Sequence, residues 1–363
     1  MTVGKSQIWR IFKRMIREII VKHLKKYPKS EITDIVKLAY QNEFGGGHLI
    51  TDEKASLEWI KKELSSVKFD PRAQLTEDIG NGIVRLNLAA VNEKISAEAI
   101  NKCFVLSANE IKGSVEAFEM KISEILDLCK EGLTPFNEKS LIEYMKKYKE
   151  YGYKPVSHSE TYRKEYSPAY RIMKKEYAEI LEMATLIEKK ARTEKVLIAI
   201  DGRCASGKST LAENLSKIFG CDIIHMDDFF LPFEKRTPER LAEPGGNIDY
   251  ERFEKEVLNS FHKNEVFSYG VFNCGSGKIE AERVINPSNI IITEGSYSLH
   301  PKFSDHYNVK IFVSTDSNTQ IKRIRERNGE EMLKMFKERW IPMEEKFFNT
   351  FNIQDFADIK LNT

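Results

Sequence analysis

The stretch Val196–Leu211, with the sequence VLIAIDGRCASGKSTL, decides how the C-terminal half of this chain folds. It begins with an unbroken apolar, largely β-branched run, which is typical of a strand buried on both faces of a parallel sheet. From Gly202 the spacing is one glycine, four further residues, and then Gly207-Lys208-Ser209. Because this pattern follows the strand directly, it predicts a phosphate-binding loop that opens into a helix beginning near Thr210.

Each residue type in this loop has a physical reason. Gly202 and Gly207 allow backbone angles and a close approach that a Cβ would obstruct, so successive N–H groups can point at phosphate oxygens beside the positive end of the helix. Lys208 brings a positive charge to the β- and γ-phosphates, and the Ser209 hydroxyl is placed to bind Mg²⁺. A chance glycine turn is the alternative, and the order of strand, complete motif and helix disfavours it. The residues expected to bind the nucleotide are Gly202, Ala205, Ser206, Gly207, Lys208, Ser209 and Thr210.

The length of the chain indicates more than one domain. Its 363 residues exceed a typical single domain, so we expect two. Folds with a phosphate-binding loop begin at or near the strand that precedes the loop, which leaves residues 1–190 to a separate domain and assigns residues 191–363 to the nucleotide-binding one. The charged run Glu188–Arg192 marks the expected boundary.

Charge and cysteine content narrow the classes of partner. A net charge of +2 gives no general push towards nucleic acid or a membrane, so we expect neither as a partner. The five cysteines are scattered and form no C-x-x-C pair, which argues against a disulfide framework or a zinc site. No apolar run approaches the roughly 20 residues of a membrane span, and the N-terminus lacks a signal-peptide core. We therefore expect a cytoplasmic protein, and the sequence leaves open whether it forms a homo-oligomer.

Apolar residues recur at helical spacing along the N-terminal half, so we predict a mostly α-helical domain there. Its first helix, 7–26, is basic and amphipathic, and a solvated face on a packed helix is favoured over a membrane-surface role. The turn at Gly80-Asn81-Gly82 precedes one predicted strand, Ile83–Leu88. Further helices are predicted at 31–43, 52–66, 95–112, 114–130 and from Tyr170 to about Lys190.

Two segments break the helical pattern of this half. Phe44-Gly45-Gly46-Gly47-His48 has three glycines where one would end a helix, so either the chain bends tightly or a ligand approaches the backbone closely. The segment from Val156 to Arg171 is dense in hydrogen-bonding side chains. We predict that the two segments converge on one pocket for a small molecule or a domain contact, with a metal site or a structural role as alternatives. The residues assigned to this second pocket are His48, His158, Glu160 and Arg163.

Strand and helix patterns alternate through the C-terminal half. Helices are predicted at Tyr250–Phe261, behind an Asp249 cap, and at Thr319–Arg327, behind Ser317. Such alternation indicates a parallel, doubly wound sheet whose ligands sit at the carboxyl ends of the strands. The further strands are predicted at Asp222–His225, Asn289–Thr293, Val309–Ser314 and Asp358–Leu361.

Polar residues follow three of these strands. They are His225-Met226-Asp227-Asp228, Thr293-Glu294-Gly295 and the basic run Lys322–Arg327. Phosphoryl transfer to a hydroxyl requires a carboxylate that accepts the proton, a carboxylate near the metal, and cations over the γ-phosphate. An Asp pair that caps a helix and arginines that face water are the alternative. Because all three groups stand at strand ends, phosphoryl transfer is favoured.

The motifs Gly202–Thr210, Met226–Phe230, Thr293–Gly295 and Arg323–Arg327 together resemble the uridine kinase and phosphoribulokinase branch of P-loop kinases, over about residues 195–363. The resemblance implies a five-stranded sheet in the order 2-3-1-4-5, ATP with Mg²⁺ as cofactors, and transfer to a hydroxyl of a small molecule. The roles it implies are Asp227 as general base, Glu294 as the acidic residue of the magnesium site, and Arg323 and Arg327 as lid arginines. They join Lys208 and Ser209, which the loop motif already assigns to the phosphates and to Mg²⁺.

The same resemblance suggests where an acceptor would bind. Asp249 stands where uridine kinases have a segment that holds the ribose, which makes it a candidate substrate contact. The segment Tyr269–Gly275 lies where uridine kinases carry a tyrosine and a histidine that read the pyrimidine, and here Tyr269 has no matching histidine within the segment. Asp228 is a further substrate candidate and also an alternative base, because it is adjacent to Asp227.

We therefore predict an ATP-dependent kinase that phosphorylates a nucleoside-, sugar- or vitamin-like small molecule, with an N-terminal domain that helps choose the acceptor or holds a second activity. The alternative is a regulator in which ATP binding controls the N-terminal domain. Asp227 favours the kinase, since a pure switch needs no acceptor base. A GTPase is disfavoured because no Asn-Lys-x-Asp guanine-reading motif is found.

Overall fold

The computed structural model describes residues 5–50, 52–263 and 265–363, with side chains described from Lys13 onward. The chain separates into two compact units, Met1–Thr185 and Leu186–Thr363. Within the described ranges, none of the helices combines the length and the apolar character that crossing a bilayer requires.

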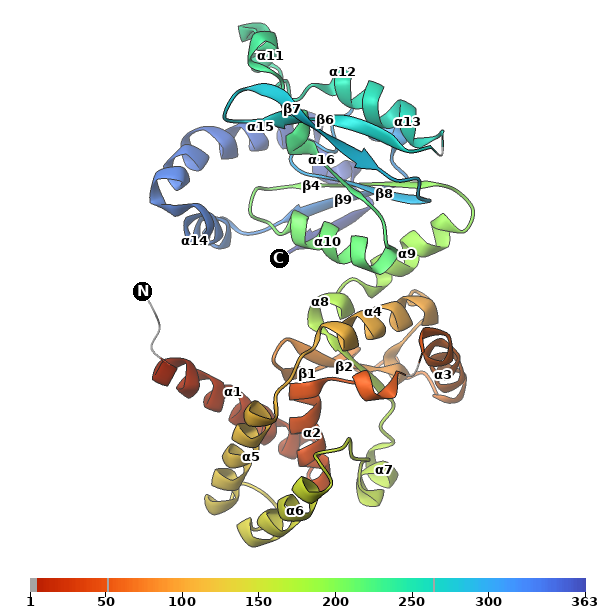
Figure 1. Ribbon diagram of the computed structural model, residues 1–363, viewed down its shortest axis with the longest axis vertical. Helices are drawn as coiled ribbons and strands as arrows, with labels where there is room; N and C mark the ends of the chain where they lie inside the picture. The colour runs from red at the N-terminus through yellow and green to blue at the C-terminus, as the bar shows by residue number, and fades with distance from the viewer. Residues whose placement is uncertain (1–4, 51, 264) are drawn as a thin grey trace. The chain divides into compact units, whose positions relative to one another are not determined.

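The N-terminal unit consists of helices and a three-stranded antiparallel sheet in the order β1-β2-β3 (Figure 1). The strands are β1 (Thr76–Gly80), β2 (Ile83–Asn87) and β3 (Tyr170–Lys174). The helices are α1 (Lys5–Lys26), α2 (Ile32–Phe44), α3 (Glu53–Ser66), α4 (Ala97–Glu110), α5 (Val115–Lys130), α6 (Glu138–Glu150), α7 (Glu160–Tyr166) and α8 (Lys175–Ala178), followed by α9 (Leu181–Ala191) at the junction of the units.

Strand β3 corrects a prediction. The apolar spacing after Tyr170 predicted one helix to about Lys190, but residues 170–174 pair antiparallel with β2, from Asn87↔Tyr170 to Ile83↔Lys174. This pairing buries Ile172, and the hydrogen bonds to a distant strand override the local helical spacing. Helices α6 and α7 and strand β1 were not predicted either.

Apolar faces of α1, α2 and α5 form the main core of this unit. Ile20, Ile35 and Phe118 are fully buried there, and the sheet contributes Ile83. Each such side chain contributes roughly 1.5–3 kcal/mol relative to an exposed one. The first four residues of β2 are all buried, so helices cover both faces of the small sheet, and this packing holds the unit together.

The triple glycine ends α2 in a tight bend. Gly45 has φ +64°, and its N–H donates to the Gln41 carbonyl at 3.0 Å. A Cβ on Gly46 would lie 2.8 Å from the ring of Phe104 on α4. Of the two alternatives drawn from the sequence, the structure therefore shows the tight bend, packed against the following helices.

The C-terminal unit is built on a five-stranded parallel sheet in the order β10-β9-β4-β8-β5. Numbered along the chain and taken from the opposite edge, this is the predicted order 2-3-1-4-5, so the doubly wound fold is confirmed. The strands are β4 (Val196–Gly202), β5 (Ile223–His225), β6 (Phe267–Asn273), β7 (Lys278–Ile285), β8 (Ile290–Glu294), β9 (Val309–Ser314) and β10 (Ile359–Asn362). The helices are α10 (Lys208–Phe219), α11 (Pro238–Ala242), α12 (Tyr250–Phe253), α13 (Asn259–Phe261), α14 (Ser317–Met335), α15 (Ile341–Phe351) and α16 (Ile353–Phe356).

Strand β4 lies at the centre of this sheet, and every one of its residues is buried as a result. Figure 1 shows α10 on one face and the β6–β7 hairpin with α12 and α13 on the other. Leu197 and Ala199 share a core with Phe253 of α12 and Tyr269 of the hairpin. The antiparallel β6–β7 hairpin was not predicted.

Two helix caps were predicted in this unit, and one is correct. The Asp249 side chain accepts from the Arg252 N–H at the start of α12, as expected. The cap of α14 is Asp316, whose carboxylate accepts from the N–H groups of Asn318 and Thr319, and Ser317 is already helical. A carboxylate one residue earlier satisfies two donors at once, which a single serine hydroxyl in that position would not.

Candidate functional site

The phosphate-binding loop lies between the end of β4 and the start of α10. Gly202 has φ +134°, and a Cβ there would lie 1.9 Å from the Val313 carbonyl oxygen of the neighbouring β9. Gly207 has φ +94° and directly precedes the first residue of α10. Only glycine fits the first position, and the second lets the loop turn its N–H groups inward at the positive end of the helix.

Lys208 is buried beneath this loop. Its Nζ donates to the carbonyls of Gly202 at 2.8 Å and Arg203 at 3.0 Å. An ammonium has three donors, so the lysine can exchange these carbonyls for phosphate oxygens while it stays under the loop. The geometry supports the expected role of Lys208 as the cation of a phosphate site.

Ser209 and Glu294 meet at the carboxyl ends of β4 and β8. The Ser209 hydroxyl donates to Glu294 Oε1 at 2.8 Å, and His225 Nδ1 lies 3.0 Å from Glu294 Oε2. Burial opposes ionisation of this carboxyl, but the hydrogen bonds from His225 and Ser209 outweigh it and lower its pKa. The oxygens of a hydroxyl and of an ionised carboxylate are ligands that Mg²⁺ prefers, so these residues fit the expected metal. His225 was not predicted as a site residue.

The two adjacent aspartates after β5 differ in their surroundings. The Asp227 side chain is exposed, and its carboxylate has no hydrogen-bond partner within the described part of the chain. Desolvation by the surrounding protein, and then the negative charge of Glu294, raise the pKa of Asp227. Asp228 is buried and its carboxylate accepts from the Tyr269 hydroxyl at 3.0 Å. Only the first carboxylate is available to a ligand.

Asp228, Asp249 and Tyr269 belong to one buried network that centres on Arg252. The Arg252 guanidinium donates to the Asp228 carbonyl at 2.5 Å and lies 3.8 Å from the Asp249 carboxylate. Lys235 donates to the same carboxylate at 3.0 Å. The structure thus brings the three predicted substrate residues together in one polar network, which Asp228 joins directly after Asp227 in the chain.

The basic residues of α14 occupy two different environments. Arg323 donates to the Ala205 carbonyl of the loop at 3.2 Å. Arg327 is exposed and donates to the Asn328 side chain at 2.8 Å. Gly329, with φ +79°, interrupts the helix two residues later. Of the two predicted lid arginines, Arg323 already contacts the loop.

Asp201 is a buried acid that the sequence analysis did not assign. Its carboxylate accepts from the N–H groups of Gly202 at 2.7 Å, Tyr297 at 3.1 Å and Leu299 at 2.9 Å. Burial raises its pKa to about 7. The side chain thereby fixes the start of the loop to the segment that follows β8. Its position as the last residue before a glycine-rich loop was the available signal.

Glu344 and Glu345 on α15 hold the loop from a distant part of the sequence. Glu344 Oε2 accepts from the Cys204 N–H at 2.9 Å, and its Oε1 accepts from the Ser296 hydroxyl at 2.5 Å. Glu345 receives two hydrogen bonds from the Arg203 guanidinium, at 2.6 and 3.1 Å. The loop is therefore held by two carboxylates whose contacts no local sequence motif predicts.

Glu344→Ala is expected to loosen this loop. It leaves the Cys204 N–H and the Ser296 hydroxyl without their acceptor, at a cost of about 1–3 kcal/mol. Glu344→Gln should be much milder, because the amide oxygen can accept from Cys204 while its NH₂ donates to Ser296. Hydrogen exchange of peptides spanning residues 200–210 measures this directly, with faster exchange in the alanine variant. Exchange in the alanine variant equal to that of the parent would show that the carboxylate does not brace the loop.

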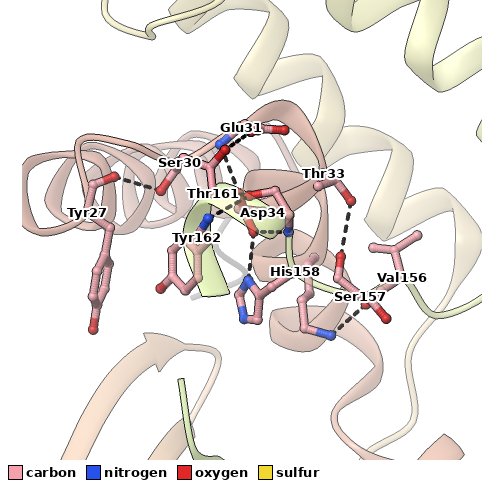
Figure 2. Close-up of polar contacts among 12 residues, drawn as sticks. Tyr27, Ser30, Glu31, Thr33, Asp34, Val156, Ser157, His158, Thr161 and Tyr162 are labelled. Atoms are coloured by element: carbon pink, nitrogen blue, oxygen red, sulfur yellow. Dashed lines mark hydrogen bonds and ion pairs between the residues drawn. The ribbon is translucent and has the colours of Figure 1, made fainter. Parts of the chain in front are cut away.

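The residues assigned to the second pocket lie in unlike positions. His158 is buried, and Figure 2 shows its ring beside Asp34. Its Nδ1 lies 2.8 Å from Asp34 Oδ1 and its Nε2 lies 2.6 Å from the Tyr170 hydroxyl, so both ring nitrogens are engaged. Glu160, Arg163 and His48 are exposed.

The two histidines nevertheless share one neighbour. Desolvation by the surrounding protein lowers the pKa of both His48 and His158, and the charge of Lys37 on α2 lowers both further. Both segments reach α2, because His158 Nδ1 lies 2.8 Å from the Asp34 carboxylate and the rings of His48 and Tyr40 have centroids 5.8 Å apart. Over the described ranges, no group of three or more His, Cys, Asp or Glu side chains is placed to hold a metal ion.

The similarity to known proteins lies in the C-terminal part of the chain. A family model described as shikimate kinase matches residues 204–361. A uridine kinase from Chlamydia pneumoniae is 30% identical over 184 residues, covering 45% of this chain and 80% of that protein. A uridine kinase from Clostridium perfringens is 27% identical over 183 residues, covering 45% and 85%. A solved structure described as a possible uridine kinase from Bacillus stearothermophilus covers 50% of this chain and 99% of its own, at 17% identity and a TM-score of 0.35.

The N-terminal half is unmatched. The matched half holds the loop, the strand-end carboxylates and the parallel sheet described above. Through this C-terminal unit, the chain belongs to the uridine kinase family of P-loop kinases.

Proposed function

We propose that the C-terminal unit is an ATP-dependent kinase that transfers the γ-phosphoryl group to a hydroxyl of a small molecule, with Asp227 as the general base. The contrast between two adjacent carboxylates carries this proposal. Asp228 is buried and bound to Tyr269, whereas Asp227 is exposed and has no hydrogen-bond partner in the described ranges. An acceptor hydroxyl can reach Asp227 without breaking any contact, and the raised pKa of this carboxyl suits a proton acceptor.

The other residues of the site divide the remaining work. Lys208 and the N–H groups of the loop bind phosphate oxygens. Ser209 and Glu294 would hold Mg²⁺, and ATP with Mg²⁺ supplies the phosphoryl group when bound. Asp227 takes the proton of the acceptor hydroxyl and thereby makes its oxygen a better nucleophile. The cations proposed to neutralise charge on the transferred group are Arg323 and Arg327, and the residues proposed to shape the acceptor side are Asp228, Asp249 and Tyr269.

ADP release in the presence of nucleosides, sugars and vitamin alcohols tests this function. One class of hydroxyl compound is expected to raise ADP release saturably and to yield a phosphorylated product. If no compound does so, and Asp227→Asn hydrolyses ATP like the parent, a nucleotide-dependent regulator replaces the kinase.

Uridine is expected to be a poor acceptor or none. Tyr269 is buried with its hydroxyl on Asp228, and the exposed Cys274 is the nearest side chain in sequence to where uridine kinases carry a pyrimidine-reading histidine. A site without a partner for the edge of the base loses the discrimination that buried hydrogen bonds provide. Steady-state assays with uridine and cytidine measure this. Efficient, saturable uridine phosphorylation at micromolar concentration would contradict the assignment of this segment.

A further inference from the structure

One face of the β6–β7 hairpin covers the segment that carries Asp227. Tyr269 and Phe272 are both buried on β6, although strict alternation would turn residues three apart to opposite faces. The pairing register of the hairpin shifts directly before Phe272, and this irregularity brings the two rings to the same face. The Tyr269 ring centroid lies 5.0 Å from that of Phe229, and the Phe272 centroid lies 6.2 Å from that of Phe230.

Arg236 holds its guanidinium over the aromatic rings at this face. Its Cζ lies 4.4 Å from the Phe233 ring centroid and 5.6 Å from the Phe272 ring centroid. Its Nε donates to the Leu231 carbonyl at 2.8 Å, so the guanidinium is fixed in place before any ligand binds. Phe272 therefore contacts both Arg236 and the segment that carries Asp227.

The two Nη groups of Arg236 are unused within the described part of the chain. They make no hydrogen bond there, and none of the described carboxylates lies within 4.0 Å of the guanidinium. Neither Nη is occluded from solvent, so both can meet a ligand. Desolvation by the surrounding protein, and then the positive charge of Arg339, lower the pKa of Arg236. A partly desolvated cation without a counter-charge is stabilised when an anion binds its free edge.

Arg240, four residues further along the chain, shows the contrast. Its guanidinium donates to the carbonyls of Gly246 and Ile248, at 3.0 and 2.9 Å. It also makes two hydrogen bonds of 2.9 Å to the Glu251 carboxylate. A structural arginine of this segment is thus fully engaged by the protein, whereas Arg236 keeps its outer edge free.

The acid next to Asp227 in the chain already has a counter-charge. The Asp228 carboxylate accepts from Tyr269, and the Arg283 guanidinium lies 3.8 Å from it. Arg283 is opposite Tyr269 in the hairpin register, so it belongs to the same face. Its side chain is 41% exposed and makes no hydrogen bond within the described residues. The charge of Asp228 is thereby offset, and this face offers an anion a second cation.

We propose that Arg236 binds an oxyanion group of the acceptor, a carboxylate or a phosphate, while the acceptor hydroxyl lies at Asp227. The inference rests on the proposed kinase function and names an anionic acceptor in place of a neutral nucleoside. The two free Nη groups form the planar fork that matches such a group. Arg236 is then a specificity-determining residue, because a neutral compound leaves its charge without a partner.

Protection of Arg236 from phenylglyoxal tests binding without requiring turnover. The full chain is modified with Mg²⁺ and a non-hydrolysable ATP analogue present, so that the nucleotide loop is filled, and peptide mass spectrometry gives the rate at each arginine. The probes are ribose, ribonate and ribose 5-phosphate, which share one carbon chain and differ in charge. An anionic probe at about ten times its dissociation constant should slow modification of Arg236 roughly tenfold, and ribose should not. Arg72, 92% exposed in the N-terminal unit, is the internal control.

Arg236→Gln tests the role in turnover. It is expected to raise the KM of the acceptor found by the ADP-release screen about 10–100-fold with little change in kcat, because a charge-assisted hydrogen bond is lost. The glutamine amide can still donate to the Leu231 carbonyl. Lys255→Gln removes the same charge at an exposed position of the same unit and should leave KM unchanged. If circular dichroism shows that Arg236→Gln is unfolded, the protection of the parent decides.

The outcomes separate this inference from the kinase itself. Protection by ribonate alone assigns a carboxylate, protection by ribose 5-phosphate alone assigns a phosphate, and each supports the site. Protection of Arg236 without turnover of any acceptor keeps the anion site and removes the kinase. Turnover of a neutral acceptor with the parent KM in Arg236→Gln keeps the kinase and overturns the anion site. No protection of Arg236, or equal protection of Arg72, also overturns it.

Discussion

Replacing Asp227 with Asn is expected to lower the turnover of acceptor phosphorylation about 10²–10⁴-fold and to leave the affinity for ATP nearly unchanged. The amide keeps the shape of the side chain but cannot accept the proton of the acceptor hydroxyl. Since the Asp227 carboxylate has no hydrogen-bond partner in the described ranges, the substitution breaks no structural contact. Steady-state kinetics with the acceptor found by the ADP-release screen, together with calorimetric ATP titration, measure both quantities.

Asp228→Asn is the matched control for this prediction. Its carboxylate accepts from the Tyr269 hydroxyl and lies 3.8 Å from the Arg283 guanidinium, so the substitution should lower stability more than turnover. An amide oxygen can still accept from Tyr269, which keeps the effect moderate. If Asp228→Asn abolished phosphorylation while Asp227→Asn did not, the base would be Asp228.

Replacing Lys208 with Ala should reduce turnover by at least about 10²–10³-fold and also weaken ATP binding. This lysine is the buried cation beneath the loop, and its Nζ bonds to Gly202 and Arg203 show that it already spans the loop from within. Without it, the loop itself offers the β- and γ-phosphates only backbone dipoles. Single-turnover assays and ATP titration measure the two effects separately.

Lys217→Ala provides the control on the same helix. This residue is exposed near the end of α10, away from the loop, so turnover and ATP affinity should both stay at the parent level. Circular dichroism of Lys208→Ala checks that α10 still forms. Undiminished turnover in Lys208→Ala would remove the loop from the mechanism.

The parts of the fold that the sequence predicts well are those set by local pattern. The apolar run of β4, the glycine spacing after it and the order of the parallel strands follow from residues that are neighbours in sequence or obey connection rules. Strand β3 is not predicted in this way, because its strand conformation depends on pairing with β2, which lies about eighty residues earlier. Local spacing cannot report such pairing.

The same limit applies to the site. Gly202, Lys208 and Ser209 are found from spacing alone, and Asp227 and Glu294 from their places at strand ends. Glu344 contacts the loop from 140 residues away, in a helix with no recognisable motif. His158 looked like a ligand-binding residue because it is polar in a polar segment, yet both of its ring nitrogens are used within the protein. A hydrogen-bond partner cannot be read from composition.

The bracing of the nucleotide loop by α14 and α15 has a topological consequence. Gln320 donates to the Cys204 carbonyl and Arg323 to the Ala205 carbonyl, while the Glu344 carboxylate accepts from the Cys204 N–H. Both ends of the segment between Arg323 and Glu344 are therefore fixed to the nucleotide loop. Residues 325–332 of this segment are exposed and include Gly329. Lengthening an exposed segment between two fixed ends costs little loop-closure free energy. We therefore expect residues 325–332 to vary in length between related chains, while the contacts of Gln320, Arg323 and Glu344 with the loop stay constant.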